Sequence, residues 1–166
     1  MILAAILLAA APLPELKVEL KPSPGRLEVQ MTVQRELPSE WVEALKAGAP
    51  VSVTYRMRLY RNRHFLWDQR VAGHELVVKA QRDTLTGVMS LSAELDGEIL
   101  ASRQVDSLEE AIRYVVHPPP SDIAIPLRVE PLWLFVRAEY LTRYKVLVFP
   151  YTIGTDWVQL AVPESQ

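Results

Sequence analysis

Four arginines fall within eight residues near the middle of the chain, and a tryptophan and an aspartate follow them. They are Arg56, Arg58, Arg61 and Arg63, followed by Trp67 and Asp68. The first two share one face of an expected strand and the next two lie at its end, so together they predict a basic patch with an aromatic rim. Guanidinium groups bind carboxylates and phosphates through paired hydrogen bonds, so the patch suits a partner that bears either group. The alternative is that these arginines pair with acidic residues on neighbouring strands and only solubilise an exposed face.

Two later runs are apolar on both faces of the strands that they are expected to form. The run 132–136 contains Trp133 and Phe135, and the run 146–151 contains Phe149. A strand that is apolar on both sides must be covered twice. Three kinds of cover remain open here: one of the expected helices, a protein partner, or an apolar ligand held near these three aromatic residues.

Residues that usually build metal and catalytic sites are few and poorly spaced. The three histidines lie 10 and 43 residues apart, so no two share the short spacing that places imidazoles on one metal ion. The chain has no cysteine and no G-x-S-x-G motif, and its six glycines form neither a dinucleotide-binding motif nor a P-loop. The sequence therefore predicts a protein that is not an enzyme and that holds no metal and no cofactor.

The charge balance gives no sign of a nucleic-acid partner. Eighteen basic residues stand against 20 acidic ones, for a net charge of −2. Nucleic-acid-binding domains usually carry a clear basic excess, so we expect no nucleic acid here.

The first fourteen residues are uncharged and almost wholly apolar. Ile2 to Ala11 forms an unbroken apolar run, closed by Pro12 and Pro14. This length is typical of a secretory signal and is too short to span a bilayer as a helix. We therefore expect a signal peptide at 1–14 and export to the periplasm or to the outer face of the cytoplasmic membrane. If the segment stays uncut, it becomes a short membrane tether and the only part of the chain that associates with a membrane.

The remaining residues, 15–166, are expected to form one β-rich domain. Apolar and polar residues alternate in 27–35 and in 51–59, where Val53, Tyr55 and Met57 point inward and Arg56 and Arg58 point outward. Residues 70–82 predict a further strand with Gly73 as a possible bulge. Asp96-Gly97 between two strand-like runs indicates a two-residue hairpin.

Two short amphipathic helices interrupt these strands. Ser39 is the expected N-cap of a helix that ends before Gly48, and Ser107 with Glu110 predicts a capping box for a second helix. Two such helices with many antiparallel strands predict a mainly β fold: an antiparallel β-sandwich or strongly curved sheet with the helices packed against it.

A set of ordered motifs resembles one family of exported bacterial proteins. They are Ala44-Leu-Lys-Ala-Gly-Ala-Pro50, Arg58-Leu-Tyr-Arg61, Leu66-Trp-Asp-Gln-Arg-Val-Ala72 and Asp83-Thr-Leu-Thr-Gly87. The family is known only as a domain of unknown function, and its genes often lie beside a sensor histidine kinase of the nitrogen-regulation type. The resemblance covers roughly residues 27–116. It implies export and supplies no catalytic residues.

These observations lead to one expected function and one alternative. We expect a non-enzymatic exported accessory domain that binds another envelope protein, with a possible link to an envelope sensor kinase. The alternative is a carrier or sensor of an apolar small molecule.

Overall fold

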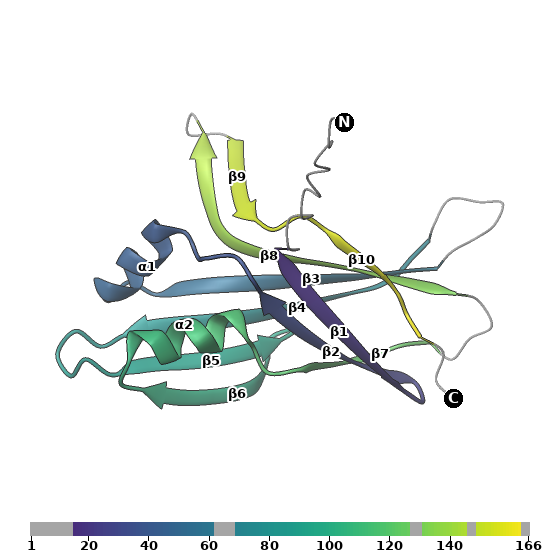
Figure 1. Ribbon diagram of the computed structural model, residues 1–166, viewed down its shortest axis with the longest axis horizontal. Helices are drawn as coiled ribbons and strands as arrows, with labels where there is room; N and C mark the ends of the chain where they lie inside the picture. The colour runs from purple at the N-terminus through teal and green to yellow at the C-terminus, as the bar shows by residue number, and fades with distance from the viewer. Residues whose placement is uncertain (1–14, 62–68, 127–130, 146–148, 164–166) are drawn as a thin grey trace, which may run out of the picture.

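The computed structural model describes residues 15–61, 69–126, 131–145 and 149–163, and these form strands with two short helices (Figure 1). The elements, in chain order, are β1 (Leu16–Ser23), β2 (Arg26–Val33), α1 (Ser39–Lys46), β3 (Val51–Arg61), β4 (Gln69–Arg82), β5 (Met89–Leu95), β6 (Glu98–Val105), α2 (Leu108–Val116), β7 (Ser121–Ala124), β8 (Leu132–Lys145), β9 (Phe149–Gly154) and β10 (Val158–Ala161). The expected leader, 1–14, lies outside the described residues.

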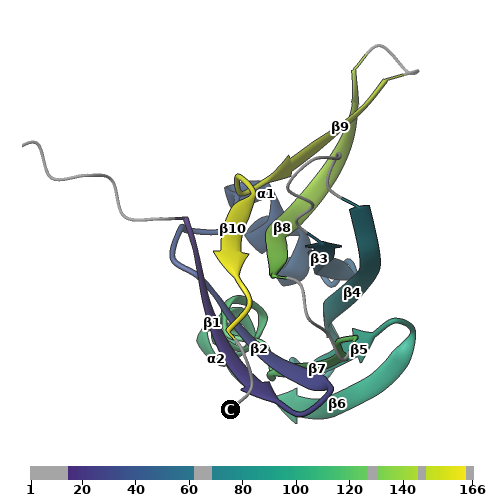
Figure 2. The ribbon, with the colours of Figure 1, turned by 90° about the vertical axis from the view of Figure 1, so that its right-hand side faces the viewer.

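The strands form two antiparallel sheets. The larger has the order β10-β8-β3-β4-β5-β6, with β9 paired to the far part of β8, and the smaller has the order β1-β2-β7. The large sheet curves strongly, and the small sheet lies across its concave side (Figure 2). This arrangement confirms the predicted fold class.

The core lies between the two sheets and follows from the alternation of the strands. In β3, Val53, Tyr55 and Met57 are buried, whereas Arg56 and Arg58 are only partly buried on the other face. The inward residues of β8, β2 and β1 join the same apolar cluster. Each large aliphatic side chain buried in this way contributes about 1.5–3 kcal/mol, so the alternation fixes which face of β3 points inward.

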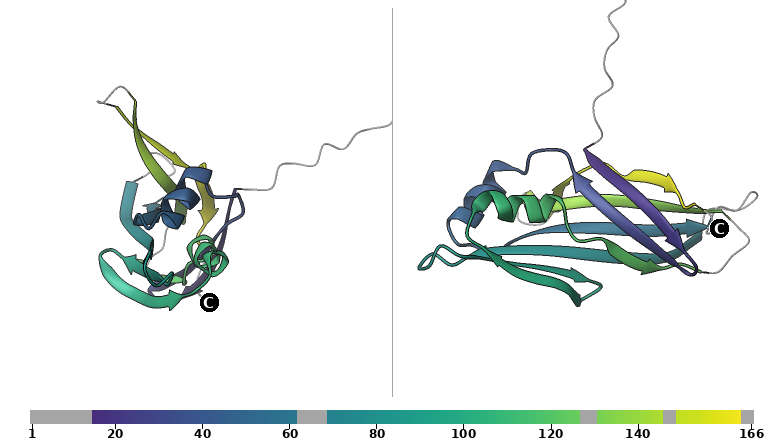
Figure 3. Two further views of the ribbon diagram at one scale, coloured as in Figure 1. Left: turned by 90° about the vertical axis from the view of Figure 1, so that its left-hand side faces the viewer. Right: turned by 60° about the horizontal axis from the view of Figure 1, so that its bottom comes forward.

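Both helices pack on the concave side of the large sheet (Figure 3). In α1, Trp41 is fully buried and its indole Nε1 donates to the Ser52 carbonyl at 3.1 Å. In α2, the Val115 carbonyl accepts a hydrogen bond of 2.6 Å from the Tyr55 hydroxyl. The helices therefore close the concave side and leave the convex face of β3 and β8 uncovered.

The two helix starts differ from each other. The Ser107 hydroxyl accepts from the Glu110 N–H at 3.1 Å, so Ser107 caps α2 as predicted. The prediction of Ser39 as the first cap is wrong, because Ser39 is already helical and the N-cap is Pro38, which has no side-chain acceptor to offer.

The irregularity in the β3–β4 pair lies two residues before the predicted one. Arg58 pairs with Gly73 and Leu59 with Ala72, but Tyr60 pairs with Arg70, so Val71 is the extra residue and Gly73 is not bulged. Because side chains alternate along a strand, this insertion turns Arg70 to the same face as Tyr60.

The predicted hairpin at Asp96-Gly97 is present between β5 and β6. Asp96 has a φ of 51° and Gly97 a φ of 88°, as a two-residue turn of this kind requires. In the described part of the chain, neither helix has the length and apolar character needed to cross a membrane.

Candidate binding site on the convex face

Both features that the sequence analysis singled out meet on the convex face of the large sheet. Arg58 on β3 lies opposite Phe135 on β8, and Tyr60 lies opposite Trp133. Residues that face each other across two strands share one side of the sheet, so arginines and aromatic rings are interleaved there.

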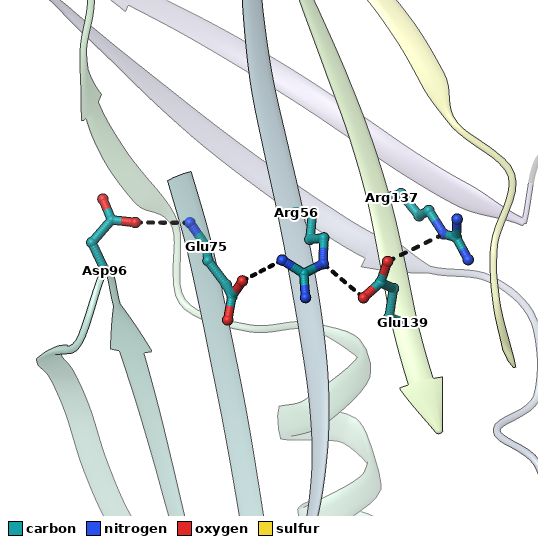
Figure 4. A network of polar contacts seen from close by, with 5 residues as sticks. All are labelled: Arg56, Glu75, Asp96, Arg137 and Glu139. Atoms are coloured by element: carbon teal, nitrogen blue, oxygen red, sulfur yellow. Dashed lines mark hydrogen bonds and ion pairs between the residues drawn. The ribbon is translucent and has the colours of Figure 1, made fainter. Parts of the chain in front are cut away.

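One arginine of this face is held in a row of ion pairs (Figure 4). The Arg56 guanidinium donates to the Glu75 carboxylate at 2.6 Å and to the Glu139 carboxylate at 2.7 Å. Arg137 lies 3.6 Å from the other oxygen of Glu139. The hydrogen bond that Arg56 donates to Glu139 is the largest cause that raises the pKa of Arg56; the attraction of both carboxylates adds to it, and desolvation partly opposes it. Arg56 therefore links β4, β3 and β8, as expected if the arginines of this face pair with acidic residues on neighbouring strands.

The same row reaches the turn between β5 and β6. One oxygen of Asp96 accepts from the backbone N–H of Glu75 at 2.8 Å, and the other lies 2.7 Å from Nδ1 of His74. These contacts orient the Asp96 side chain and fix the middle of β4 to the turn; Figure 4 shows the contact with Glu75.

Beside this row lies a recess of about 350 Å³, which we call the aromatic recess. It is lined by Arg58, Tyr60, Phe135 and Trp157. The Arg58 guanidinium carbon lies 4.5 Å from the centre of the Trp157 ring, and Tyr60 meets Phe135 edge to face at 5.2 Å. Such stacked and edge-on contacts hold the four side chains in defined positions.

A second, polar recess of about 240 Å³, the arginine recess, adjoins the first and shares Arg58 with it. Its charged lining consists of Arg56, Arg58, Arg70, Glu75 and Asp96, with His74 beside them. The Arg70 guanidinium lies directly over Gly73, where any Cβ would collide with it. Gly73 is therefore the residue type that lets Arg70 fold down beside Arg58.

Arg58 and Arg70 differ from Arg56 in their partners. Within the described part of the chain, neither makes an ion pair with a carboxylate. Their guanidinium groups remain able to donate to a further acceptor.

The sequence profile of one protein family, described as "Domain of unknown function (DUF4390)", matches residues 16–132. The chain belongs to this family. The matched part of the DUF4390 chain runs from β1 to the first residue of β8, so it includes Arg58, Tyr60 and Arg70, whereas Phe135 and Trp157 lie beyond it. No curated protein and no solved structure matches the chain.

The predicted site residues of this DUF4390 chain fall into separate places. Arg56, Arg58, Trp133 and Phe135 share the convex face, and Arg61 is half-buried at the end of β3. The backbone of Phe149 pairs with Lys145, which lies ten residues further along β8 than Phe135. Arg63, Trp67 and Asp68 lie outside the described residues.

Three residues of the site were missed by sequence reasoning. Trp157 comes from the segment before β10, Tyr60 lies between two arginines in β3, and Arg70 reaches the face only through the bulge at Val71. The alternation of β3 already placed Tyr60 beside Arg58, whereas nothing local to the sequence places Trp157 or Arg70 there.

The described residues of the DUF4390 chain show no gathering of three or more metal-ligating side chains. His74 and His117 bind different partners, because His117 Nδ1 lies 3.2 Å from the Thr32 hydroxyl. What the convex face offers chemically is binding: flat aromatic surfaces and guanidinium donors arranged around two adjoining recesses.

Proposed function

We propose that this chain is an exported, non-enzymatic accessory domain that binds another envelope protein through the convex face. The observation that supports this most directly is the aromatic recess, where two aromatic rings, an indole and a stacked arginine stay partly exposed. No described helix or strand covers them.

The composition of the recess is that of a protein-binding site. Trp, Tyr and Arg are the residue types that most often dominate binding energy at interfaces, and they do so when packed neighbours hold them in place. Arg58, Tyr60, Phe135 and Trp157 are held in this way by their contacts with each other.

The proposed location follows from the leader. Residues 1–14 have the length and apolar character of a secretory signal. The resemblance to a family encoded beside a sensor histidine kinase makes the extracytoplasmic part of such a kinase our first candidate partner.

Export is tested with a fusion of the whole chain to alkaline phosphatase, which is active only outside the cytoplasm. We expect phosphatase activity from the complete chain and none when residues 1–14 are deleted. Equal activity from the two fusions would contradict export by this leader.

Binding is tested by crosslinking in cells from one position on the convex face. Gln159 on β10 is exposed and lies opposite Phe135, so a photoreactive residue there would sit beside the aromatic recess. Ser102 on β6 is a matched control, because it is exposed on the same sheet five strands away, about 24 Å along the sheet. We expect a discrete adduct in the envelope fraction from Gln159 and not from Ser102. Equal adducts, or none, would exclude this face as the binding surface.

An apolar ligand is the second candidate, favoured by the volume of the aromatic recess. About 350 Å³ lies at the lower end of the range of small-molecule pockets. Native mass spectrometry of the purified chain tests it: a co-purified small molecule that is lost in Phe135→Ser would support a carrier, and a spectrum of the bare chain alone would contradict it.

A further inference from the structure

Positive charge is unevenly neutralised on the convex face. Three arginines and two carboxylates line the arginine recess, and one of the arginines, Arg56, uses Glu75 and the nearby Glu139. Asp96 is occupied by the Glu75 N–H and by His74. One positive charge is therefore in excess in the recess, although the whole chain has a net charge of −2.

The geometry of Arg58 keeps its donors available. A guanidinium that stacks on an indole uses its flat face, and its N–H groups point outward in the plane of the group. The Arg58 guanidinium carbon lies 4.5 Å from the centre of the Trp157 ring. Because Arg58 makes no ion pair with a described carboxylate, its N–H groups can still donate to a carboxylate of a partner. Arg70, folded over Gly73, adds a second guanidinium to the same recess.

The two recesses adjoin at Arg58. When a partner places a large apolar side chain in the aromatic recess, the partner's adjacent residues thus lie beside Arg58 and Arg70. Carboxylates at that point would form charge-assisted hydrogen bonds with both arginines, whereas a basic group would be repelled by them.

We propose that the convex face binds a partner segment in which Asp or Glu stands next to a large apolar side chain. This rests on the proposed function and specifies its partner: the apolar side chain occupies the aromatic recess, and the carboxylate binds Arg58 and Arg70.

The test selects peptides from a random dodecapeptide library on the immobilised full chain. Four chains are compared: the wild type, Arg58→Gln/Arg70→Gln, Phe135→Ser and the control Arg103→Gln. Arg103 is the matched control because it also stacks on an aromatic ring, with its guanidinium carbon 4.6 Å from Tyr114, but lies on β6, at the opposite edge of the sheet from β10. Circular dichroism and thermal unfolding establish that each chain is folded.

We expect the wild type and Arg103→Gln to enrich peptides with Asp or Glu adjacent to Trp, Phe, Leu or Ile. A selected peptide, labelled and measured by fluorescence anisotropy, should bind at least tenfold more weakly to Arg58→Gln/Arg70→Gln and to Phe135→Ser. Binding to the wild type should weaken further between 0.05 and about 0.5 M NaCl, because exposed charges are screened.

The opposite results separate the two proposals. Peptides whose enrichment depends on Phe135 but which show no excess of acidic residues would overturn the proposal of an acidic partner segment. The convex face would then remain the proposed binding surface. A selected motif that binds the wild type and Phe135→Ser equally, or no motif on any chain, would overturn both proposals.

Discussion

The hydroxyl of Tyr55 attaches helix α2 to the large sheet, and Tyr55→Phe measures that attachment. The hydroxyl donates to the Val115 carbonyl at 2.6 Å, and both groups are buried. Val115 lies in the last turn of α2, where carbonyls have no partner within the helix, so the tyrosine supplies the missing donor. Removing it leaves a buried acceptor without a partner, which costs about 1–3 kcal/mol.

The matched control is Tyr140→Phe. Tyr140 is also buried in the large sheet, but its hydroxyl has no hydrogen-bond partner among the described residues. Removing a buried hydroxyl that makes no bond should leave the stability unchanged or raise it by up to about 1 kcal/mol. Comparing the two variants separates the loss of a hydrogen bond from the loss of one oxygen atom.

Urea unfolding, followed by circular dichroism, provides the assay. For Tyr55→Phe we expect a lower midpoint with an unchanged denaturant slope, and a melting temperature lower by about 2–4 °C for each kcal/mol lost. If Tyr55→Phe is as stable as the wild type, or Tyr140→Phe is destabilised equally, then the bond to Val115 does not hold α2 in place.

The pH dependence of the unfolding free energy gives a second test of the hydrogen bond between Tyr55 and Val115. Burial raises the pKa of Tyr55 well above its usual value of 10.0, so the folded chain keeps it protonated while the unfolded chain ionises above about pH 10. Its stabilising contribution is therefore fully present below pH 10 and declines as the pH rises further. The difference in unfolding free energy between the wild type and Tyr55→Phe should accordingly narrow above pH 10. A constant difference from pH 7 to 11 would contradict the burial of this phenol.

Three further predictions concern single local features. Ser107→Ala removes the N-cap of α2 and should lower the free energy of unfolding by about 1 kcal/mol, measured by urea unfolding beside the control Ser39→Ala, for which we expect almost no change. Hydrogen bonds from the Leu85 and Thr86 N–H groups lower the pKa of Asp83, so its contribution is present above pH 4 and declines as the pH falls further. Asp83→Asn should therefore destabilise the chain more at pH 6 than at pH 2.5, and equal effects at the two pH values would contradict this. A double-mutant cycle of Arg56→Gln and Glu139→Gln should give a coupling energy of about 0.5–1 kcal/mol that shrinks in 1 M NaCl, whereas zero coupling in low salt would mean that the pair does not link β3 to β8.

Much of the fold could be predicted because its signals are local. The alternation in β3 gave the correct inward residues, and the Asp96-Gly97 turn and the Ser107 cap are defined by residues close in sequence. β1 shows the same alternation but follows directly on the apolar leader and was not predicted. Ser39 was misplaced by one position because Pro38 can precede the first helical residue without offering a side-chain acceptor.

The site could be predicted only in part, because it depends on which strands become neighbours. Arg58 and Phe135 were both singled out, yet their pairing across β3 and β8 joins residues that are far apart in the chain. The position of Arg70 depends on one inserted residue, since without the bulge at Val71 its side chain would point to the other face. Sequence spacing carries no signal for either fact.

The most direct test of binding through the convex face is the yield of the crosslink from Gln159 in cells, measured in the wild-type chain and in Phe135→Ser. Phe135 lines the aromatic recess opposite Gln159 and is half-buried on the convex face, outside the apolar core, so the variant should remain folded. We predict a discrete envelope adduct in the wild type and its loss in Phe135→Ser, with the Ser102 control giving no adduct in either chain. An adduct of undiminished yield in a folded Phe135→Ser chain would contradict the proposal.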